Sequence, residues 1–392
     1  MRYKFPRTEF LSEVEPYLND SFYVKEKDGY IVVNYLNNST ETFPDVWDGK
    51  IFDHAATVRR ECRGLIFDAK TKRVIARRLH KFWNLNERLE TAEENIPDKH
   101  SMRVYEKLDG SMITPIYLES GISWGTKAGI TDVGMQAETF VGSRLSYIIF
   151  ANWCKSLDLT PIFEWCSRKN TIVVDHPVDR LVLLDVRDMV TGKYVPRQNL
   201  IELSEKFNIE LVKEVKSDFH TIRDKLKDNT TDEGIVLQYE DGHRVKVKTE
   251  WYVALHRAKE AITRERDVVM LILDAKLDDL KPLLNAEDLE SINRYEKEFW
   301  NYVNITTDKI KAIHKLAQTM TRKEFALSNV GAYLHKAMVF KLLDKVRHFE
   351  YFEEVLNSIR KYPVQRSIFT KKLHEFLEWE FDWKGTPEDD NA

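Results

Sequence analysis

One short segment of the chain places a lysine where nucleophilic chemistry is plausible. Lys107 is followed by Leu108, Asp109, Gly110 and Ser111, so a carboxylate, a permissive backbone position and a hydroxyl come soon after the amine. A lysine amine that has lost its proton can attack the phosphorus atom of a nucleotide, and neighbouring cations favour that loss. Asp109 and Gly110 would turn the chain and let the backbone approach a nucleotide closely. Taken alone, the segment also fits a surface hairpin with an exposed lysine.

Carboxylates and lysines follow in an order that suits covalent transfer of a nucleotide. Glu164 ends one apolar run, and Glu233 opens another over 234–239. Each glutamate could bind a ribose hydroxyl or help hold a divalent metal, although glutamates at strand ends are more often solvated. Lys246 and Lys248 lie two residues apart, so a strand would place both on one face. An anion such as an α-phosphate would relieve their repulsion; a solvated amphipathic strand is the alternative.

Cations and aromatic residues upstream of Lys107 could complete such a site. Arg63 and Lys81 could neutralise the β- and γ-phosphates of a leaving pyrophosphate. Phe82 or Trp83 could stack on a base or a ribose. The alternative is structural, with packed aromatic rings and a surface ion pair.

The elements that must position these residues change character along the chain. Short strands are expected over 30–35, 64–67, 73–76, 111–117, 181–186 and 234–239, with helical stretches over 134–155 and 197–207. This mixture predicts an α+β fold with mainly antiparallel sheets. From about residue 251 apolar residues recur at helical spacing, and Thr321 with Glu324 forms a capping-box pattern. We therefore expect a sheet-rich domain over 1–255 and an all-helical domain over 256–392.

Composition narrows the classes of protein. The formal net charge is −4, so no global positive field indicates nucleic-acid binding, and any such site must be a local patch. Cys62, Cys154 and Cys166 show no Cys-x-x-Cys spacing, so neither a disulfide framework nor a zinc site is expected. The start of the chain is too polar for a signal peptide, and no apolar run reaches 18 residues. These features predict a cytosolic protein without a membrane segment.

With these segments in this order, the chain resembles the covalent lysyl-nucleotidyltransferase superfamily of ligases and mRNA capping enzymes. Within that superfamily it is most similar to the T4 RNA ligase 1 family. The matching segments, in family order, are 61–64, 81–87, 107–111, 163–164, 233–234, 246–248 and 251–256. One departure is Leu108, because the phage member of the family has an acidic residue there. That position varies across the superfamily, so we expect no effect on the chemistry.

The resemblance implies an ATP-dependent RNA ligase that uses Mg²⁺ and works in three steps. Lys107 would take AMP from ATP, pass it to the 5′-phosphate of an RNA end, and an RNA 3′-hydroxyl would then displace AMP. The resemblance gives domain 1–255 the adenylyltransferase role. It implies nucleotide contacts at Tyr35, Arg63, Lys81, Gly110, Lys127, Glu164, Lys246 and Lys248. It implies metal contacts at Glu164 and Glu233, and a water-mediated second magnesium site at Tyr252 with Asp278 and Asp279.

The resemblance also suggests the substrate and partners. In the family the helical C-terminal domain is associated with choosing breaks in tRNA anticodon loops, so domain 256–392 would select the RNA. The expected partners are RNA with 5′-phosphate and 3′-hydroxyl ends, such as nicked tRNA, and a separate end-healing kinase-phosphatase. We expect a monomer in the cytoplasm, which is the host cytoplasm if a phage encodes it.

Four other functions fit part of the pattern. DNA ligases and GTP-using capping enzymes normally continue into a β-barrel OB domain, whereas the sequence after Lys248 has helical periodicity. Fungal- or plant-type tRNA ligases have a helical domain but carry fused kinase and phosphodiesterase domains, for which 392 residues leave no room. An inactive RNA-binding module would keep the fold. Its loss of function should show as loss of Lys107 or the glutamates, and all are present.

Overall fold

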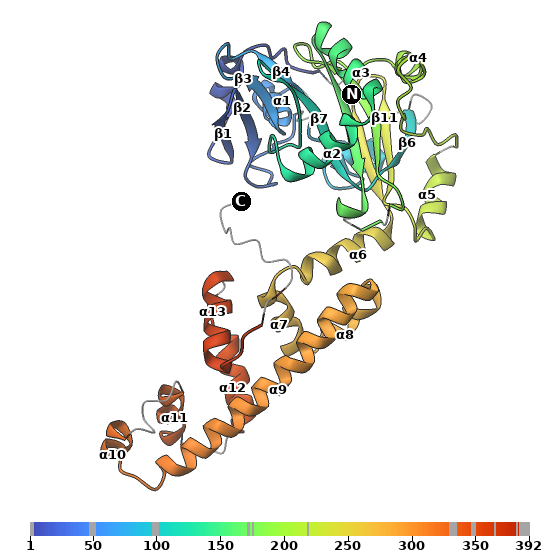
Figure 1. Ribbon diagram of the computed structural model, residues 1–392. Helices are drawn as coiled ribbons and strands as arrows, with labels where there is room; N and C mark the ends of the chain where they lie inside the picture. The colour runs from blue at the N-terminus through green and yellow to red at the C-terminus, as the bar shows by residue number, and fades with distance from the viewer. Residues whose placement is uncertain are drawn as a thin grey trace. The chain divides into compact units, whose positions relative to one another are not determined.

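The computed structural model describes residues 4–46, 52–95, 102–170, 173–174, 176–217, 219–328, 335–345, 350–363, 366–381 and 383. The chain forms two compact units, Met1–Val253 and Ala254–Ala392 (Figure 1). Among the described residues, the first unit contains three four-stranded sheets with flanking helices, and the second is helical. The α+β class with a helical C-terminal region is thereby confirmed.

The first sheet is an antiparallel meander in the N-terminal part of the chain. Its order is β1 (Phe22–Lys27), β2 (Tyr30–Tyr35), β3 (Leu65–Asp68) and β4 (Val74–Ala76). Helix α1 (His54–Glu61) lies between β2 and β3 in sequence, and the Asp53 side chain caps it by accepting a hydrogen bond from the Ala56 amide. The end of α1 therefore leads directly to Arg63.

The second and third sheets are joined by the segment that follows Lys107. The second sheet has the order β10 (Arg180–Asp188), β9 (Leu159–Cys166), β7 (Ser111–Leu118) and β8 (Gly121–Gly125). The third has the order β5 (Trp83–Asn84), β12 (Arg244–Lys248), β11 (Gly234–Tyr239) and β6 (Met102–Lys107). Pairing is antiparallel except between β5 and β12. Residues 108–110 therefore cross from one sheet to the next.

The helices of the first unit are α2 (Asp132–Gly142), α3 (Leu145–Ser156), α4 (Arg197–Phe207) and α5 (Phe219–Lys227). Helix α3 packs on β9, where Phe150 meets Phe163 in the main core. The sequence predicted one helical stretch over 134–155, and the structure has two helices. The break follows Gly142, where the Ser143 hydroxyl donates to the Phe140 carbonyl and so competes with continued helical bonding.

The second unit is organised along one long helix. It contains α7 (Glu265–Leu273), α8 (Leu277–Leu280), α9 (Ala286–Ala317), α10 (Arg322–Leu327), α11 (Lys336–Leu343), α12 (Tyr351–Arg360) and α13 (Arg366–Leu377). Helix α6 (Glu250–Ala261) contains the boundary between the units. Helix α9 contacts α11, α12 and α13 and buries Ile292, Tyr295 and Phe299 on one face. The capping box of Thr321 and Glu324 is confirmed at the start of α10.

Short 3₁₀ turns complete the described structure, at Leu11–Glu13, Glu15–Tyr17, Leu89–Thr91, Glu93–Asn95, Arg168–Asn170 and Lys281–Leu283. The three cysteines are free and buried, and burial raises the pKa of each thiol. Within the described residues, no helix has both the length and the apolar character needed to cross a bilayer.

Candidate active site

A carboxylate bridges the candidate nucleophile and a second lysine. Lys107 ends β6 and faces Gly234 in the ladder, while Gly234 faces Lys248 on the other side. Glu233 precedes that glycine, so its side chain lies between the two lysines. Its Oε2 is 2.5 Å from Lys107 Nζ, and its Oε1 is 3.1 Å from Lys248 Nζ. Glu233 is only 4% exposed, which rules out a solvated surface hairpin for Lys107.

Gly234 is required by the backbone at this point. Its φ is +144°, and a Cβ there would lie 2.1 Å from the Val247 carbonyl oxygen. A larger residue would therefore push β11 away from β12. The Glu233-Gly234 pair thus places the carboxylate at the strand end while keeping Lys248 within ion-pair distance.

The turn after Lys107 packs on the second sheet. A Cβ at Gly110 would lie 2.3 Å from the Trp165 carbonyl oxygen on β9. The close backbone approach at Gly110 is therefore to β9, and its role in nucleotide binding stays a prediction. The packing instead fixes where β6 ends and β7 begins, and so where the lysine points.

Asp109 holds this turn from inside. Its Oδ2 accepts hydrogen bonds from the backbone amides of Val173 and Val174, at 2.7 and 2.6 Å. Its Oδ1 accepts a hydrogen bond of 2.8 Å from the Tyr252 hydroxyl. With 3% exposure, Asp109 ties three distant segments together. From the sequence alone, Asp109 was predicted only to turn the chain.

Glu164 brings a second carboxylate to the site from β9, where it pairs with Met112 on β7. Burial, with Glu233 nearby, raises the pKa of Glu164 to about 8, although Lys107 acts in the opposite direction. Among the described residues, no group of three or more histidine, cysteine or acidic side chains forms a metal cage. Mg²⁺ commonly uses one or two carboxylates and completes its shell with water and substrate phosphates. Glu164 and Glu233 fit that donor set.

Lys246 lies on β12 between the two sheets. It and Lys248 are more accessible than Val245 and Val247, which confirms the predicted alternation. Its Nζ stands 4.7 Å from the centre of the Phe82 ring, and among the described residues it has neither a hydrogen bond nor an ion pair. Burial and the surrounding cations hold the pKa of Lys246 well below its ordinary value. This lysine therefore lies in a strongly positive environment without a counter-charge.

A further cluster of cations surrounds Tyr35. Lys127 Nζ donates a 3.0 Å hydrogen bond to the Tyr35 hydroxyl, and Lys81 Nζ is 5.5 Å from that ring. Burial, with Arg63 and Lys127 nearby, lowers the pKa of Lys81 to about 8. Burial alone would raise the pKa of Tyr35, yet Lys127, Arg63 and Lys81 lower it. The structure thus gathers four residues that the resemblance assigned to the nucleotide.

Gly64 allows the segment that carries Arg63 to pack closely on the loop that carries Lys127. It adopts φ +77°, and a Cβ there would lie 2.5 Å from the Lys127 Cα. The segment after α1 is therefore packed directly on the loop after β8. The glycine keeps both cations beside Tyr35.

The predicted base-stacking role of the upstream aromatic residues is not supported. Trp83 is 1% exposed, packs against Phe43, and is covered by the Arg88 guanidinium 4.3 Å from its ring. Phe82 is buried beneath the Lys246 amine. Both rings serve the structure, because they support lysine side chains from below.

The predicted second metal site involves residues of both units. Asp278 and Asp279 lie on α8, where Asp278 is 83% exposed and pairs with Lys281 at 2.9 Å. Tyr252, in the first unit, donates to Asp109. The shared site therefore stays a prediction.

The sequence missed a buried ion network behind Arg63. Glu61 Oε2 accepts from Arg77 Nε at 2.9 Å, and its Oε1 accepts from Arg187 Nη2 at 2.8 Å. All three side chains are fully buried. Burial alone would raise the pKa of Glu61, but the adjacent Arg187 and Arg77 guanidiniums lower it. An arginine directly after β4 and another inside β10 were the signals that could have indicated this network.

Two protein families match the chain in succession. The family described as RNA ligase matches residues 61–252, and the T4 RNA ligase 1 C-terminal domain matches residues 259–381. The chain belongs to the T4 RNA ligase 1 family. It is thus an RNA ligase. The first match contains Arg63, Lys107 and Glu233, and the second contains Asp278 and Asp279.

Individual proteins with known sequences or structures are similar to this ligase. A Thermovibrio ammonificans protein named "Putative RNA ligase" is 29% identical over 379 residues, which are 93% of each chain. A "Putative bifunctional polynucleotide kinase/RNA ligase" of Autographa californica nuclear polyhedrosis virus is 25% identical over 253 residues, or 59% of this ligase and 35% of that protein. A solved archaeal ATP-dependent RNA ligase has 14% identity and a TM-score of 0.47, covering 90% of this chain and 96% of its own.

Proposed function

We propose that the ligase joins 5′-phosphate and 3′-hydroxyl RNA ends with ATP, through a lysyl-AMP and an RNA-adenylate intermediate. The observation that carries this proposal is the Glu233 bridge between Lys107 and Lys248. This bridge gives the Lys107 amine an adjacent proton acceptor, and it places a second cation, Lys248, beside the same carboxylate. Such an arrangement suits in-line attack on a nucleotide phosphorus.

In the first step the Lys107 amine forms a P–N bond to the α-phosphorus of ATP. The bond from that phosphorus to the bridging oxygen breaks, and pyrophosphate leaves with the bonding electrons. Glu233, 2.5 Å from Nζ, accepts the amine proton. Lys246 and Lys248 stabilise charge on the α-phosphate, while Lys81 and its neighbours neutralise the leaving pyrophosphate.

The next two steps move AMP and then release it. An oxygen of the RNA 5′-phosphate attacks the phosphorus of lysyl-AMP, the P–N bond breaks, and Lys107 recovers its proton. The RNA 3′-hydroxyl then attacks the activated 5′-phosphorus, loses its proton and expels AMP. A phosphodiester bond forms, and no oxidant or reductant is consumed.

A divalent cation such as Mg²⁺ fits this account. Glu164 and Glu233 would hold it, with phosphate oxygens and water completing its shell. When bound, such an ion supplies charge stabilisation at the transferring phosphoryl group. Glu164 also contributes by orienting the ribose, and Tyr252 with Asp278 and Asp279 would serve a second ion.

The substrate we propose is broken tRNA in the cytoplasm. The match of residues 259–381 to the T4 RNA ligase 1 C-terminal domain supports an RNA-selecting role for the helical unit. A relative named for both polynucleotide kinase and RNA ligase activity supports a separate end-healing partner, since this chain matches only part of that protein. The ligase itself would act as a monomer.

Sealing of two RNA substrates tests the order of the steps. Lys107→Ala should lose ATP-dependent joining of 5′-phosphorylated RNA. It should still seal RNA that already carries a 5′-adenylate, because that step needs no nucleophilic lysine. Lys227→Ala, an exposed lysine on α5, is the matched control and should join both. ATP-dependent joining by Lys107→Ala would overturn the proposal, and loss of both reactions would overturn the step order.

A further inference from the structure

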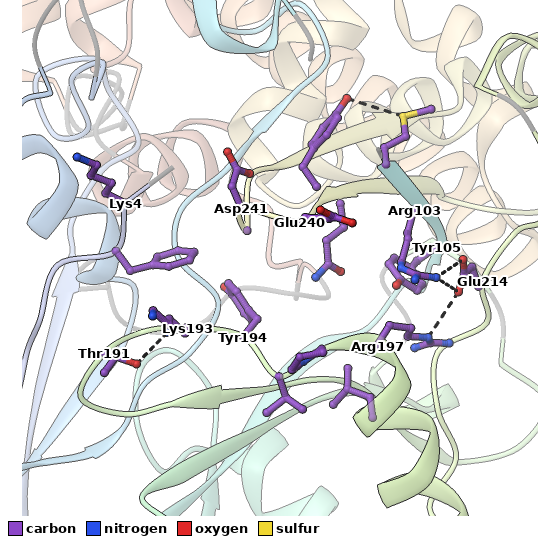
Figure 2. A pocket seen from close by; sticks show the side chains of 18 residues that line it. Lys4, Arg103, Tyr105, Thr191, Lys193, Tyr194, Arg197, Glu214, Glu240 and Asp241 are labelled. Carbon is purple, nitrogen blue, oxygen red and sulfur yellow. Dashed lines mark hydrogen bonds and ion pairs between the residues drawn. The ribbon is translucent and has the colours of Figure 1, made fainter. Parts of the chain in front are cut away.

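The first unit contains a cavity of about 1010 Å³ that Lys107 does not line (Figure 2). Its walls come from the start of β6, from the turn between β11 and β12, and from the loop before α4. Tyr105 and Arg103 line it two and four residues before Lys107 on the same strand, roughly 7 and 13 Å from Lys107 at the usual rise per residue. None of the candidate active-site residues described above, which include Arg63 and Lys248, lines this cavity.

The cavity is unusually rich in flat side chains. Phe5, Tyr105, Tyr194 and Tyr239 all line it. The Phe5 and Tyr194 rings meet edge to face with centres 5.4 Å apart, and the Arg187 guanidinium lies 4.8 Å from the centre of each ring. The Arg197 guanidinium lies 4.8 Å from the centre of the Tyr105 ring, which makes a second planar surface. Volume and planarity together suit an aromatic ligand.

Arg197 also has a donor without a partner. Its side chain is 9% exposed, and its Nη2 donates to the Val212 carbonyl at 2.8 Å. Its Nε is 3.7 Å from Glu214 Oε2, near enough for an ion pair but without a hydrogen bond. Its Nη1 is buried and has no hydrogen-bond partner among the described residues. A buried donor of this kind requires an explanation, and a bound group or an ordered water supplies one.

A side-chain amide from the sheet adds hydrogen-bonding capacity. Gln238 lines the cavity from β11 and is partly buried. Its Nε2 reaches Asp185 Oδ2 only at 3.5 Å, the outer limit of a hydrogen bond. Because its carbonyl oxygen accepts no hydrogen bond from the described residues, both ends of the amide are available to a ligand.

The charges around the opening are mixed. Lys4, Arg103 and Lys193 are accompanied by Glu214, Glu240 and Asp241 (Figure 2). An opening of alternating sign is a poor clamp for a polyphosphate, which would meet three carboxylates. It suits a neutral flat group whose edge carries both donors and acceptors, because each kind of edge atom finds a partner.

We propose that this cavity is a second nucleobase site that binds a purine. The aromatic and guanidinium planes would stack on the base, as proteins do with unstacked RNA bases. Arg197 Nη1 would donate to an acceptor on the purine edge, and the Gln238 amide would exchange two hydrogen bonds with another part of it. The base would be presented by an RNA strand or by a free nucleoside. This inference goes beyond the chemistry at Lys107 and does not depend on it.

Equilibrium dialysis tests the site with the full chain. The probes are labelled adenosine and guanosine, which lack phosphates, and a short purine-containing RNA matched with an all-pyrimidine RNA of equal length. We expect saturable binding of a purine nucleoside, or tighter binding of the purine RNA than of the pyrimidine RNA. The first result assigns the base to a free nucleoside and the second assigns it to RNA.

Variants locate the binding. Gln238→Leu and the near-isosteric Gln238→Glu should each weaken purine binding tenfold or more, and so should Arg197→Lys. Gln198→Leu on the exposed side of α4 is the matched control and should bind like the unaltered protein. Thermal unfolding would show that each variant is folded. Equal binding by all variants would place the base elsewhere, and no purine binding by the unaltered protein would mean that the cavity holds water only; either result overturns the proposal.

Covalent labelling by ATP, measured on the same samples, separates this site from the proposed reaction. Purine binding that depends on Gln238 without any Lys107 label would leave the cavity assignment standing and remove the proposed ligase chemistry. Label at Lys107 without purine binding would do the reverse.

Discussion

The two units differ in where they place charged side chains. The first buries it: Glu61, Arg77 and Arg187 are fully enclosed, and Lys246 lies between sheets without a counter-charge. The second unit has an apolar core and keeps ion pairs such as Arg322–Asp344 on its exposed surface. Burying charge costs desolvation energy that contacts seldom recover. The first unit therefore carries the cost of buried charge, whereas the second is stabilised mainly by apolar packing.

One buried polar cluster interrupts the apolar core of the second unit. Glu265 is 3% exposed and accepts a 2.7 Å hydrogen bond from the Tyr295 hydroxyl. His374 Nε2 lies 2.8 Å from the same carboxylate oxygen. These contacts join α7, α9 and α13. The cluster therefore stabilises helix packing at one point, unlike the convergent lysines of the first unit.

The largest expected effect on stability is at the buried network. Glu61→Gln leaves Arg77 and Arg187 without their carboxylate and should lower the free energy of unfolding by about 3–5 kcal/mol. Urea unfolding followed by circular dichroism measures it. Glu205→Gln, exposed on α4, is the control and should change little. A loss below about 1 kcal/mol at Glu61 would erase the contrast between the units.

Replacing Lys246 should raise stability while it lowers activity. Lys246→Met removes a partly buried charge but keeps the side-chain length, so the temperature of unfolding should rise. Lysyl-AMP formation should slow by about a hundredfold or more, because charge on the α-phosphate loses its stabilisation. Quenched-flow labelling and a thermal melt give both numbers, with Lys227→Met as the exposed control. Normal labelling by Lys246→Met would show that β12 does not face the nucleotide.

The cations around Tyr35 predict a pH dependence of nucleotide binding. The pKa of Lys81 is about 8; burial, Arg63 and Lys127 lower it, whereas Tyr35 and Glu87 oppose them. The charged form binds phosphate, so ATP affinity should be full below pH 8 and fall by up to tenfold per pH unit above it.

Calorimetry at several pH values checks this in a variant lacking the nucleophile, so that no reaction occurs. Adding Lys81→Arg should flatten the decline, because arginine stays charged. An equally steep decline with Lys81→Arg would assign the effect to another group.

The smallest effect is expected on the surface of the second unit. Asp344→Asn breaks the pair with Arg322, in which both side chains are more than half exposed. Exposed pairs contribute little, because water screens them, so the free energy of unfolding should hardly change. Lys107 labelling should be unaffected. A clear loss of stability would mean that this unit also depends on its charges.

Much of the fold and of the candidate site follows from local sequence patterns. Each of the six strands expected from apolar runs is present, with ends that differ by at most two residues, because alternation and turn residues act locally. The face shared by Lys246 and Lys248 follows from the same periodicity. The order of Lys107, Glu164 and Glu233 indicated the chemistry before any geometry was known.

The rest depends on contacts between distant segments. Asp109 binds the amides of Val173 and Val174, and no periodicity specifies which loop meets a buried carboxylate. Trp83 is buried by contacts with Phe43 and Arg88. The sequence alone does not show these contacts, so a stacking role was predicted for it. The Glu61 network was missed for the same reason, since each of its members resembles a surface residue when considered alone.

The central claim is that Lys107 becomes covalently linked to AMP. Purified protein, shown by mass to carry no nucleotide, is incubated with Mg²⁺ and ATP labelled at the α-phosphate, and with GTP labelled likewise. Label that survives denaturing electrophoresis is measured for the unaltered chain, for Lys107→Ala and for the exposed-lysine control Lys227→Ala. Our account predicts label from ATP in the first and third proteins and none in Lys107→Ala. Label retained by Lys107→Ala, or absent from the folded unaltered protein, would contradict it.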